Sequence, residues 1–263
     1  MGAGLMERKG TKIRECGIPK ARHRRGILAA MERQRIVVFS GAGVSAESGL
    51  RTFRDADGLW EEYPIEEVAT PEGWRRDPAK VLHFYDLRRQ QVIAARPNEA
   101  HLAIAELEKY FQVDVVTQNI DDLHERAGSS RVLHLHGEIL KARSTAEPAL
   151  VVPVNGPSLG LGDLCPLGSQ LRPHIVWFGE EVPLLPEAAS IVRSADHLIV
   201  VGTSLNVYPA AGLVHLLRNT ARLHVVDPGE LSLPARPLQH IKQKASAGIP
   251  ALAFQLIGTL TGR

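Results

Sequence analysis

The chain has 263 residues, of which 44% are hydrophobic and 23% are charged, and its formal net charge is +2. This length suits one large α/β domain, with or without a small insertion, and the near balance of charge argues against a nucleic-acid-binding protein. The sequence contains neither a run of eighteen apolar residues nor an apolar signal-peptide core. We therefore expect no membrane partner and no secretion. Cys16 and Cys165 lie in unlike contexts, which disfavours a disulfide and favours a reducing, cytoplasmic location.

The N-terminal extension, residues 1–34, differs from the rest of the chain. Residues 1–35 hold ten Lys or Arg against three Glu and show little apolar periodicity. We therefore expect a flexible extension, with at most a short helix over 27–33. Two other interpretations stay open. The Arg-rich stretch could be a mitochondrial presequence, although Glu7, Glu15 and the lack of Ser count against it, or the tail could contact acidic partners.

From residue 35 to about 257, short apolar runs alternate with helical patterns. The first run, Ile36 to Ser40, is continuous and rich in β-branched residues, as in a strand buried on both faces. Further strands are predicted over 113–117, 132–135, 197–202 and 223–227, and helices over 79–95 and 98–110. This alternation predicts an α/β fold with a Rossmann-like parallel sheet. A Gly/Pro-rich segment, about 142–172, predicts a small inserted subdomain, and 258–263 form a C-terminal tail.

A glycine-rich turn, Gly41 to Gly49, follows the first predicted strand. A turn that leads into a helix can offer backbone N–H groups to phosphate oxygens. The same glycines could instead serve only to pack the strand against its neighbours. The third glycine comes three residues later than in the usual dinucleotide fingerprint, and no strand with a terminal acid follows about twenty residues on. An ordinary hydride-transferring dehydrogenase is therefore disfavoured, and 50–60 look like a loop that closes over a cofactor.

Five sequence blocks carry a family resemblance: GAGVSAESGLRTFRDADGLW at 41–60, TQNIDDLHERAG at 117–128, HLHG at 134–137, HIVWFGE at 174–180 and GTSLNVYPAAG at 202–212. Together they resemble the sirtuins, over residues 35 to about 257. The chain is similar to bacterial members that remove acetyl and succinyl groups and to the mitochondrial desuccinylase group. The resemblance implies an NAD-dependent protein-lysine deacylase that consumes NAD and releases nicotinamide and O-acyl-ADP-ribose. Its implied partners are NAD and acyl-lysine proteins or peptides.

The resemblance also implies the residues of the NAD site. His136 would be the catalytic base, because a histidine with a pKa near neutrality can deprotonate a ribose hydroxyl. His134 alternates with it along the predicted strand and so points to the other face, which argues against a metal-binding pair. Asn119 and Asp121 would hold the nicotinamide amide and its ribose, and they could also cap a helix that starts near Asp122. The full implied set of NAD contacts is Gly41, Ala42, Gly43, Ala46, Thr52, Phe53, Arg54, Trp60, Gln118, Asn119, Ile120, Asp121, Gly202, Thr203, Ser204, Asp227 and Ala245.

Asp227 ends a predicted strand at a position where many relatives carry Asn. An acid there can accept hydrogen bonds from ribose hydroxyls and would repel a 2′-phosphate. NAD is therefore the expected dinucleotide, rather than NADP.

The peptide site is predicted over 174–180, which has the pattern of an exposed β-edge segment. In relatives this segment pairs with the extended acyl-lysine peptide through the backbone, so little sequence specificity is expected. Val176 and Phe178 would line the aliphatic channel, next to Gly179 and Glu180.

The acyl preference depends on Tyr85 and Arg88, which are three residues apart on one predicted helix face. Without the resemblance, they would be interpreted as a half-buried Tyr beside a solvated Arg. In sirtuins that remove succinyl and malonyl groups, such a pair binds the distal carboxylate, and the arginine fork suits that ligand. Ala69 resembles the small residue that widens the pocket of that subgroup. We therefore expect removal of acetyl, succinyl and malonyl groups.

Most sirtuins hold a zinc ion with four cysteines, and here the corresponding stretches are Arg143 to Ala146 and Cys165 to Gly168. One cysteine cannot complete a tetrahedral zinc site, and Asp163 and His174 lack the usual spacing. The sequence therefore predicts a small subdomain without structural zinc.

Two other functions stay open. The same NAD chemistry would allow a protein ADP-ribosyltransferase, and a chain that has lost its zinc cysteines could be a non-catalytic NAD-responsive binding module. The presence of His136, Asn119 and Asp121 argues against the second.

Overall fold

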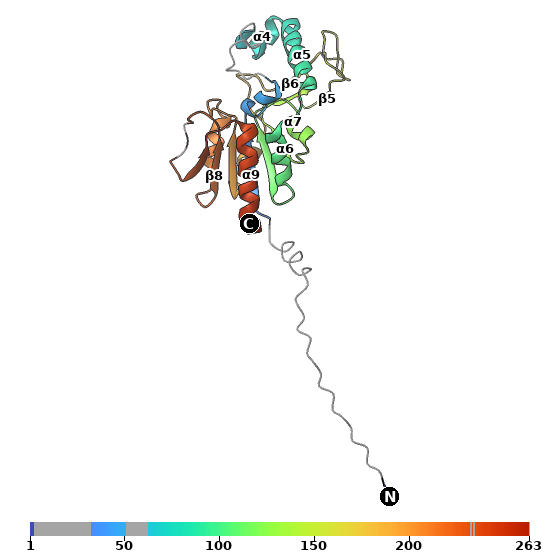
Figure 1. Ribbon diagram of the computed structural model, residues 1–263. Coiled ribbons are helices and arrows are strands. Elements are labelled where there is room, and N and C mark those ends of the chain that lie inside the picture. Colours follow the sequence, from blue (N-terminus) through green and yellow to red (C-terminus); the bar gives the residue numbers. More distant parts are fainter. Residues whose placement is uncertain (3–32, 51–62, 232, 234, 263) are drawn as a thin grey trace. The chain divides into compact units, whose positions relative to one another are not determined.

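The computed structural model describes residues 1–2, 33–50, 63–231, 233 and 235–262. The predictions for the N-terminal extension, for Cys16 and for the cofactor contacts Thr52, Phe53, Arg54 and Trp60 concern residues outside the described part. The chain divides into two units, Met1–Arg33 and Gln34–Arg263. Every described helix and strand lies in the second unit (Figure 1). Among the described helices, none has the length and apolar character needed to cross a membrane.

Six parallel strands form the main sheet in the order β3-β2-β1-β7-β8-β9. They are β1 (Arg35–Ser40), β2 (Gln112–Thr117), β3 (Val132–His134), β7 (His197–Val201), β8 (Arg222–Val226) and β9 (Leu238–Ile241). The predicted strands are confirmed to within two residues, whereas β9 was not predicted. The chain adds strands on one side of β1 and then returns to its other side. The boundary between β1 and β7 is therefore the topological switch point, where open α/β sheets bind ligands.

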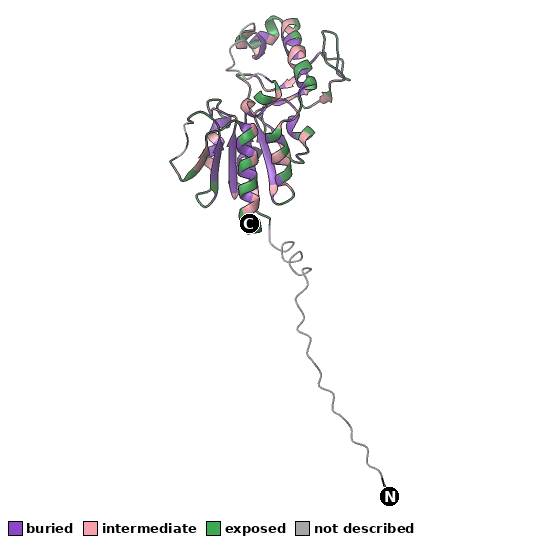
Figure 2. Cartoon of the chain, viewed as in Figure 1, coloured by how far each residue is buried: buried purple, intermediate pink, exposed green. Residues whose placement is uncertain are grey.

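The sheet is covered on both faces, which explains its continuous apolar strands. Val37 and Phe39 of β1 pack with α8 (Leu185–Ser194) and η3 (Ala210–Leu216). Ile36 and Val38 point the other way, toward α6 (Glu99–Leu107) and α9 (Ala245–Thr261). Figure 2 shows the resulting band of buried residues along the strands. Because successive side chains of a strand point to opposite faces of the sheet, a strand that is buried on both faces contributes to two cores, one on each face.

The predicted helices have recognisable start signals. The helix predicted over 79–95 is α5 (Pro78–Ala94), which has a proline in its first turn and the Asp77 carboxylate accepting from Lys80 N at 2.9 Å. The preceding helices are α3 (Ile65–Val68) and α4 (Pro71–Arg76). The helix predicted over 98–110 is α6, and Asn98 caps it by accepting from Ala100 N at 2.9 Å. The predicted end at Tyr110 is wrong, because residues 108–110 leave the helix through i to i+3 turns that direct Phe111 into the core.

A second, antiparallel sheet has the order β5-β4-β6 and consists of β4 (Gly137–Ser144), β5 (Val151–Pro153) and β6 (Leu171–Ile175). The segment predicted as an insertion, about 142–172, lies within this sheet and its loops. Helix α7 (Leu123–Ala127) precedes it in the chain. In Figure 1, α4, α5, β5 and β6 are grouped beyond one end of the parallel sheet.

Candidate active site

The glycine-rich turn lies directly against the end of β7. Gly43 N donates to Gly202 O at 2.8 Å. A Cβ on Gly41 would lie 2.7 Å from the Thr203 Cβ, and one on Gly43 would lie 2.8 Å from the Gly202 Cα. The packing interpretation of these glycines is therefore confirmed. The same tight approach brings two predicted NAD-binding loops together at the switch point.

The turn does not lead directly into an α-helix, contrary to the expected arrangement. It contains two short 3₁₀ turns, η1 (Ala42–Val44) and η2 (Ala46–Ser48), and it ends at Gly49, which takes a left-handed φ of 86°. A left-handed residue ends helical geometry, which explains why the turns remain short.

Ser45, between these turns, connects the predicted nicotinamide residues. Its hydroxyl donates to Asp121 Oδ2 at 3.0 Å and accepts from Asn119 Nδ2 at 3.1 Å. Asn119 and Asp121 are each only 6% exposed. The other Asp121 oxygen accepts from Leu123 N at 3.1 Å, so the capping interpretation is confirmed for Asp121.

The direction of the Ser45 bonds is set by His101, a buried residue of α6. Asn98 N donates to His101 Nδ1 at 3.3 Å, so the ring proton must be on Nε2, 3.4 Å from Ser45 Oγ. Burial lowers the pKa of His101 to about 4, which keeps the ring neutral at pH 7. The Ser45 oxygen thus accepts two bonds and donates its proton to Asp121. Neither Ser45 nor His101 was predicted as a site residue; Ser45 lay inside a recognised block, whereas only the fold brings His101 to it.

His136 lies in the turn between β3 and β4, and its Nδ1 is 3.1 Å from Gln118 O. A carbonyl oxygen can only accept, so Nδ1 carries the proton and Nε2 has a free lone pair. Burial lowers the pKa of His136, against a smaller opposing effect of the bond to Gln118. The ring is therefore neutral at physiological pH and suited to accept a proton at Nε2.

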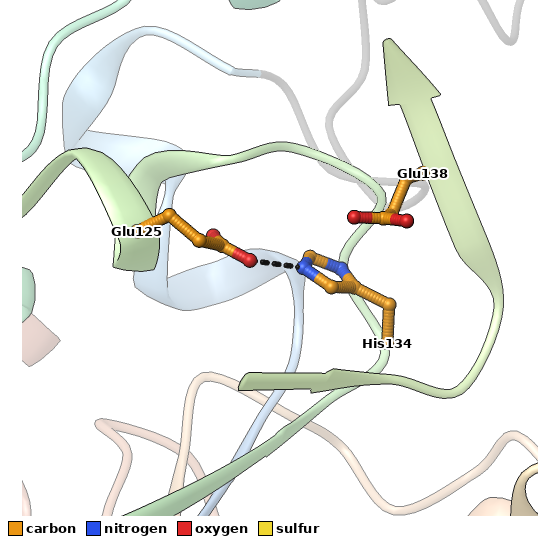
Figure 3. A group of neighbouring side chains, drawn as sticks. All are labelled: Glu125, His134 and Glu138. Atoms are coloured by element: carbon orange, nitrogen blue, oxygen red, sulfur yellow. Dashed lines mark hydrogen bonds and ion pairs between the residues drawn. The ribbon is translucent and has the colours of Figure 1, made fainter. Parts of the chain in front are cut away.

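His134 has the opposite character, and Figure 3 shows its contact with Glu125. Its Nδ1 lies 2.9 Å from Asn119 O and its Nε2 lies 2.7 Å from Glu125 Oε1. Both partners accept, so both ring nitrogens carry protons. Burial acts to lower the pKa of His134, but the bonds to Glu125 and Asn119 outweigh it and raise the pKa. Two histidines that are two residues apart therefore hold adjacent carbonyls of one loop, one as a cation and the other as a neutral ring.

Glu125, His134 and Glu138 also form a group that could hold a metal ion, with their ligand atoms within 4.8 Å of one another. In the structure all three side chains form ion pairs: His134 pairs with Glu125 within the group, and Glu138 pairs with Lys141. A metal would have to displace the proton on His134 Nε2. His136 is not a member of this group.

Three successive residues after β6 contact the predicted substrate residues. Val176 N donates to His136 O at 2.9 Å, Trp177 Nε1 donates to the Tyr85 hydroxyl at 3.0 Å, and Phe178 N donates to Ala69 O at 3.0 Å. The structure therefore places His136, Tyr85 and Ala69 against one segment, residues 176–178. Trp177 was not predicted, although it lay inside the HIVWFGE block.

The prediction of an edge segment over 174–180 is only partly right. β6 is an edge strand of the small sheet but ends at Ile175. Residues 177–180 form a turn closed by Glu180 N to Trp177 O, with Gly179 at a φ of 88°. The Glu180 carboxylate binds Arg143 and Arg172. Its predicted peptide contact remains a prediction.

Tyr85 and Arg88 lie on α5, and the interpretation of Tyr85 as half-buried is wrong, since it is 2% exposed. Burial raises the pKa of Tyr85. Burial lowers the pKa of Arg88, whereas the charges of Tyr85 and Asp121 act to raise it. Arg88 is thus a half-buried cation whose charge interacts with Tyr85, its partner in the predicted pair, and with Asp121 in the nicotinamide loop.

The remaining predicted NAD residues lie along the carboxyl edge of the sheet. Gln118 Nε2 donates to Thr203 Oγ1 at 3.0 Å, which links the loops after β2 and β7. Asp227 follows β8 and accepts from Gly229 N at 2.8 Å. Ala245 is buried at the start of α9. Side chains from separate parts of the sequence are therefore gathered where a dinucleotide would cross the switch point.

At the position of the family's zinc module, an apolar cluster holds the small sheet. Leu82, Ala142, Leu159, Cys165 and Leu171 are buried together. The Ser144 hydroxyl accepts from Ala146 N at 3.2 Å and from Glu147 N at 3.1 Å, and Cys165 Sγ donates to it at 3.4 Å. Side-chain packing and a hydroxyl thus order the turns that cysteine thiolates order in zinc modules.

Treatment with EDTA is therefore expected to leave the melting temperature (Tm) unchanged, because apolar packing and the Ser144 hydroxyl order these turns in the part of the chain that the structure describes. Ser144→Ala, which leaves two amides without their acceptor, is expected to lower the Tm by about 2–4 °C. Differential scanning calorimetry measures both. A drop after EDTA that added zinc reverses would contradict the prediction.

The order of the parallel sheet, the glycine contact between β1 and β7 and the polar carboxyl edge together define a dinucleotide-binding α/β protein. The chain belongs to the Sir2 family, whose model matches residues 41–209. It is 59% identical to an "NAD-dependent protein deacylase" of Helicobacter pylori over 193 residues, which is 73% of this chain and 84% of that protein. A protein of the same name from Bacteroides thetaiotaomicron is 48% identical over 228 residues, covering 84% of this chain and 97% of that one. A solved Sir2 homologue in complex with NAD is 40% identical, with a TM-score of 0.77, over 90% of this chain and 94% of that chain.

Proposed function

We propose that this protein removes acyl groups from protein lysines with consumption of NAD, and that it accepts acetyl, succinyl and malonyl groups. The observation that carries the proposal is the contact of His136 Nδ1 with Gln118 O at 3.1 Å, which leaves Nε2 to accept a proton. The names of the similar bacterial proteins support the same activity.

The residues at the switch point fit NAD. Gly41 and Gly43 let the glycine-rich turn lie directly against Gly202 and Thr203, so the two loops that would bind the pyrophosphate stand together at the switch point. Asn119 and Asp121 would bind the nicotinamide amide and its ribose, and Ser45 holds both in place. Gln118, Thr203 and Asp227 would contact the remaining phosphates and the adenosine ribose.

NAD supplies a ribose carbon that becomes electrophilic as nicotinamide leaves, and the acyl oxygen can attack it. His136 Nε2 would take the proton from a ribose hydroxyl. Val176 N binds His136 O, so the backbone that would guide the acyl-lysine also supports the base. Tyr85 and Arg88 would bind the distal carboxylate of an acidic acyl group.

The test incubates the protein with NAD and matched peptides carrying acetyl-, succinyl-, malonyl- or unmodified lysine. We expect nicotinamide, O-acyl-ADP-ribose and free lysine from the acylated peptides alone. ADP-ribose attached to protein would support an ADP-ribosyltransferase instead. NAD binding without turnover would support a non-catalytic module.

A further inference from the structure

Trp177 lies between Tyr85 and a cluster of charged residues. It is 2% exposed, and its indole Nε1 donates to the Tyr85 hydroxyl at 3.0 Å. An indole N–H can only donate, so the Tyr85 oxygen is the acceptor in this bond. The Tyr85 proton is therefore directed away from Trp177, toward another acceptor.

The orientation of Trp177 is held from several sides. The Arg172 guanidinium lies over the indole ring, 3.4 Å from its centroid. Glu180 accepts from Trp177 N at 2.9 Å and binds Arg172 at 2.7 Å. Arg143 binds the same carboxylate at 2.9 Å. Both the backbone and the ring of Trp177 are thus fixed by one group of ion pairs, and the ring can rotate little.

We propose that Trp177 is a positioning residue for acyl specificity, which aligns the Tyr85 hydroxyl so that its proton is donated to the carboxylate of an acidic acyl group. This inference rests on the proposed deacylase function. A tyrosine hydroxyl can either donate or accept, and a carboxylate needs a donor. Because Trp177 occupies the acceptor side, Tyr85 is prepared for an anion before the substrate arrives. An acetyl group has no distal carboxylate and gains nothing from this alignment.

The test compares kcat/KM for succinyl- and acetyl-lysine peptides in the full chain. Trp177→Phe keeps an aromatic ring and removes the donor, and it is expected to lower the succinyl value about five- to tenfold while the acetyl value changes less than twofold. The loss is expected in KM for the succinyl peptide, with KM for NAD unchanged. Trp74→Phe is the matched control, because this neighbouring indole has its ring centroid 5.8 Å from that of Trp177 and belongs to α4. It is expected to leave the succinyl-to-acetyl ratio unchanged.

Tyr85→Phe alone should reproduce the loss of succinyl preference. The variant that combines Tyr85→Phe with Trp177→Phe should lose no more of the succinyl-to-acetyl ratio of kcat/KM than Tyr85→Phe does. The inference is overturned if Trp177→Phe lowers both substrates equally, if its effect persists in the Tyr85→Phe background, or if Tyr85→Phe leaves the ratio unchanged. Absence of acyl turnover by the unaltered chain would overturn the proposed function itself, and the role of Trp177 with it. An unaltered succinyl-to-acetyl ratio in an active Trp177→Phe variant would overturn the role of Trp177 alone.

Discussion

Replacement of His136 by Ala is expected to lower kcat for deacylation about 10²- to 10⁴-fold, the usual contribution of a positioned general base. The ring nitrogen that accepts the proton is defined by the bond from Nδ1 to Gln118 O. The variant loses both this contact and the base. Rates of O-acyl-ADP-ribose formation measure the loss, and circular dichroism checks the fold.

His83→Ala is a suitable control, since His83 is an exposed residue of α5. It is expected to retain full activity. If His136→Ala kept more than a tenth of the rate, His136 would not be the base.

The pH dependence of deacylation should follow the protonation of His136. Burial lowers the pKa of His136 below its usual value of 6.5. The neutral form is active, so activity should fall as the pH drops through this lowered pKa, and stay constant above it until other groups titrate. A profile of kcat/KM against pH reports the free enzyme. An acidic limb with a midpoint at or above 6.5 that disappears in a variant without His136 would contradict the lowered pKa. An acidic limb that persists unchanged in that variant would contradict the assignment of His136 as the base.

Replacement of Arg88 by Met is expected to reduce kcat/KM for succinyl- and malonyl-lysine peptides about 30- to 100-fold. The change removes a charge-assisted bond from a partly buried site, and such bonds are worth about 2–3 kcal/mol. Deacetylation should change less than threefold, because an acetyl group has no carboxylate to bind. Parallel assays with the three peptides measure the effect.

Arg88→Lys separates charge from shape, because lysine keeps the charge but lacks the planar fork. We expect it to recover only part of the succinyl activity. Equal losses on acetyl and succinyl peptides would show that Arg88 supports the site as a whole, since its charge also interacts with Asp121. Undiminished succinyl activity in Arg88→Met would show that the carboxylate binds elsewhere.

The sequence alone predicted five of the six strands described in the parallel sheet, and it placed polar residues at the carboxyl edge of that sheet. Continuous apolar runs predicted β1, β2, β7 and β8, because a strand covered on both faces must be apolar throughout. Polar residues that end such strands meet at one edge in any parallel sheet. Gln118, Asn119, Asp121 and Thr203 could therefore be placed at one edge of the sheet without coordinates, whereas their contacts with NAD remain predictions.

The tertiary structure alone decided orientation and protonation. His134 and His136 are two residues apart, but the bond to Glu125 favours the cation at His134, whereas burial keeps His136 neutral and Gln118 O places its proton on Nδ1. His101 and Trp177 act through partners 56 and 92 residues away. The direction of a hydrogen bond and the charge of a ring depend on the group at the other end. The packing of distant segments determines which partner group a side chain contacts, and a local sequence pattern does not predict that partner.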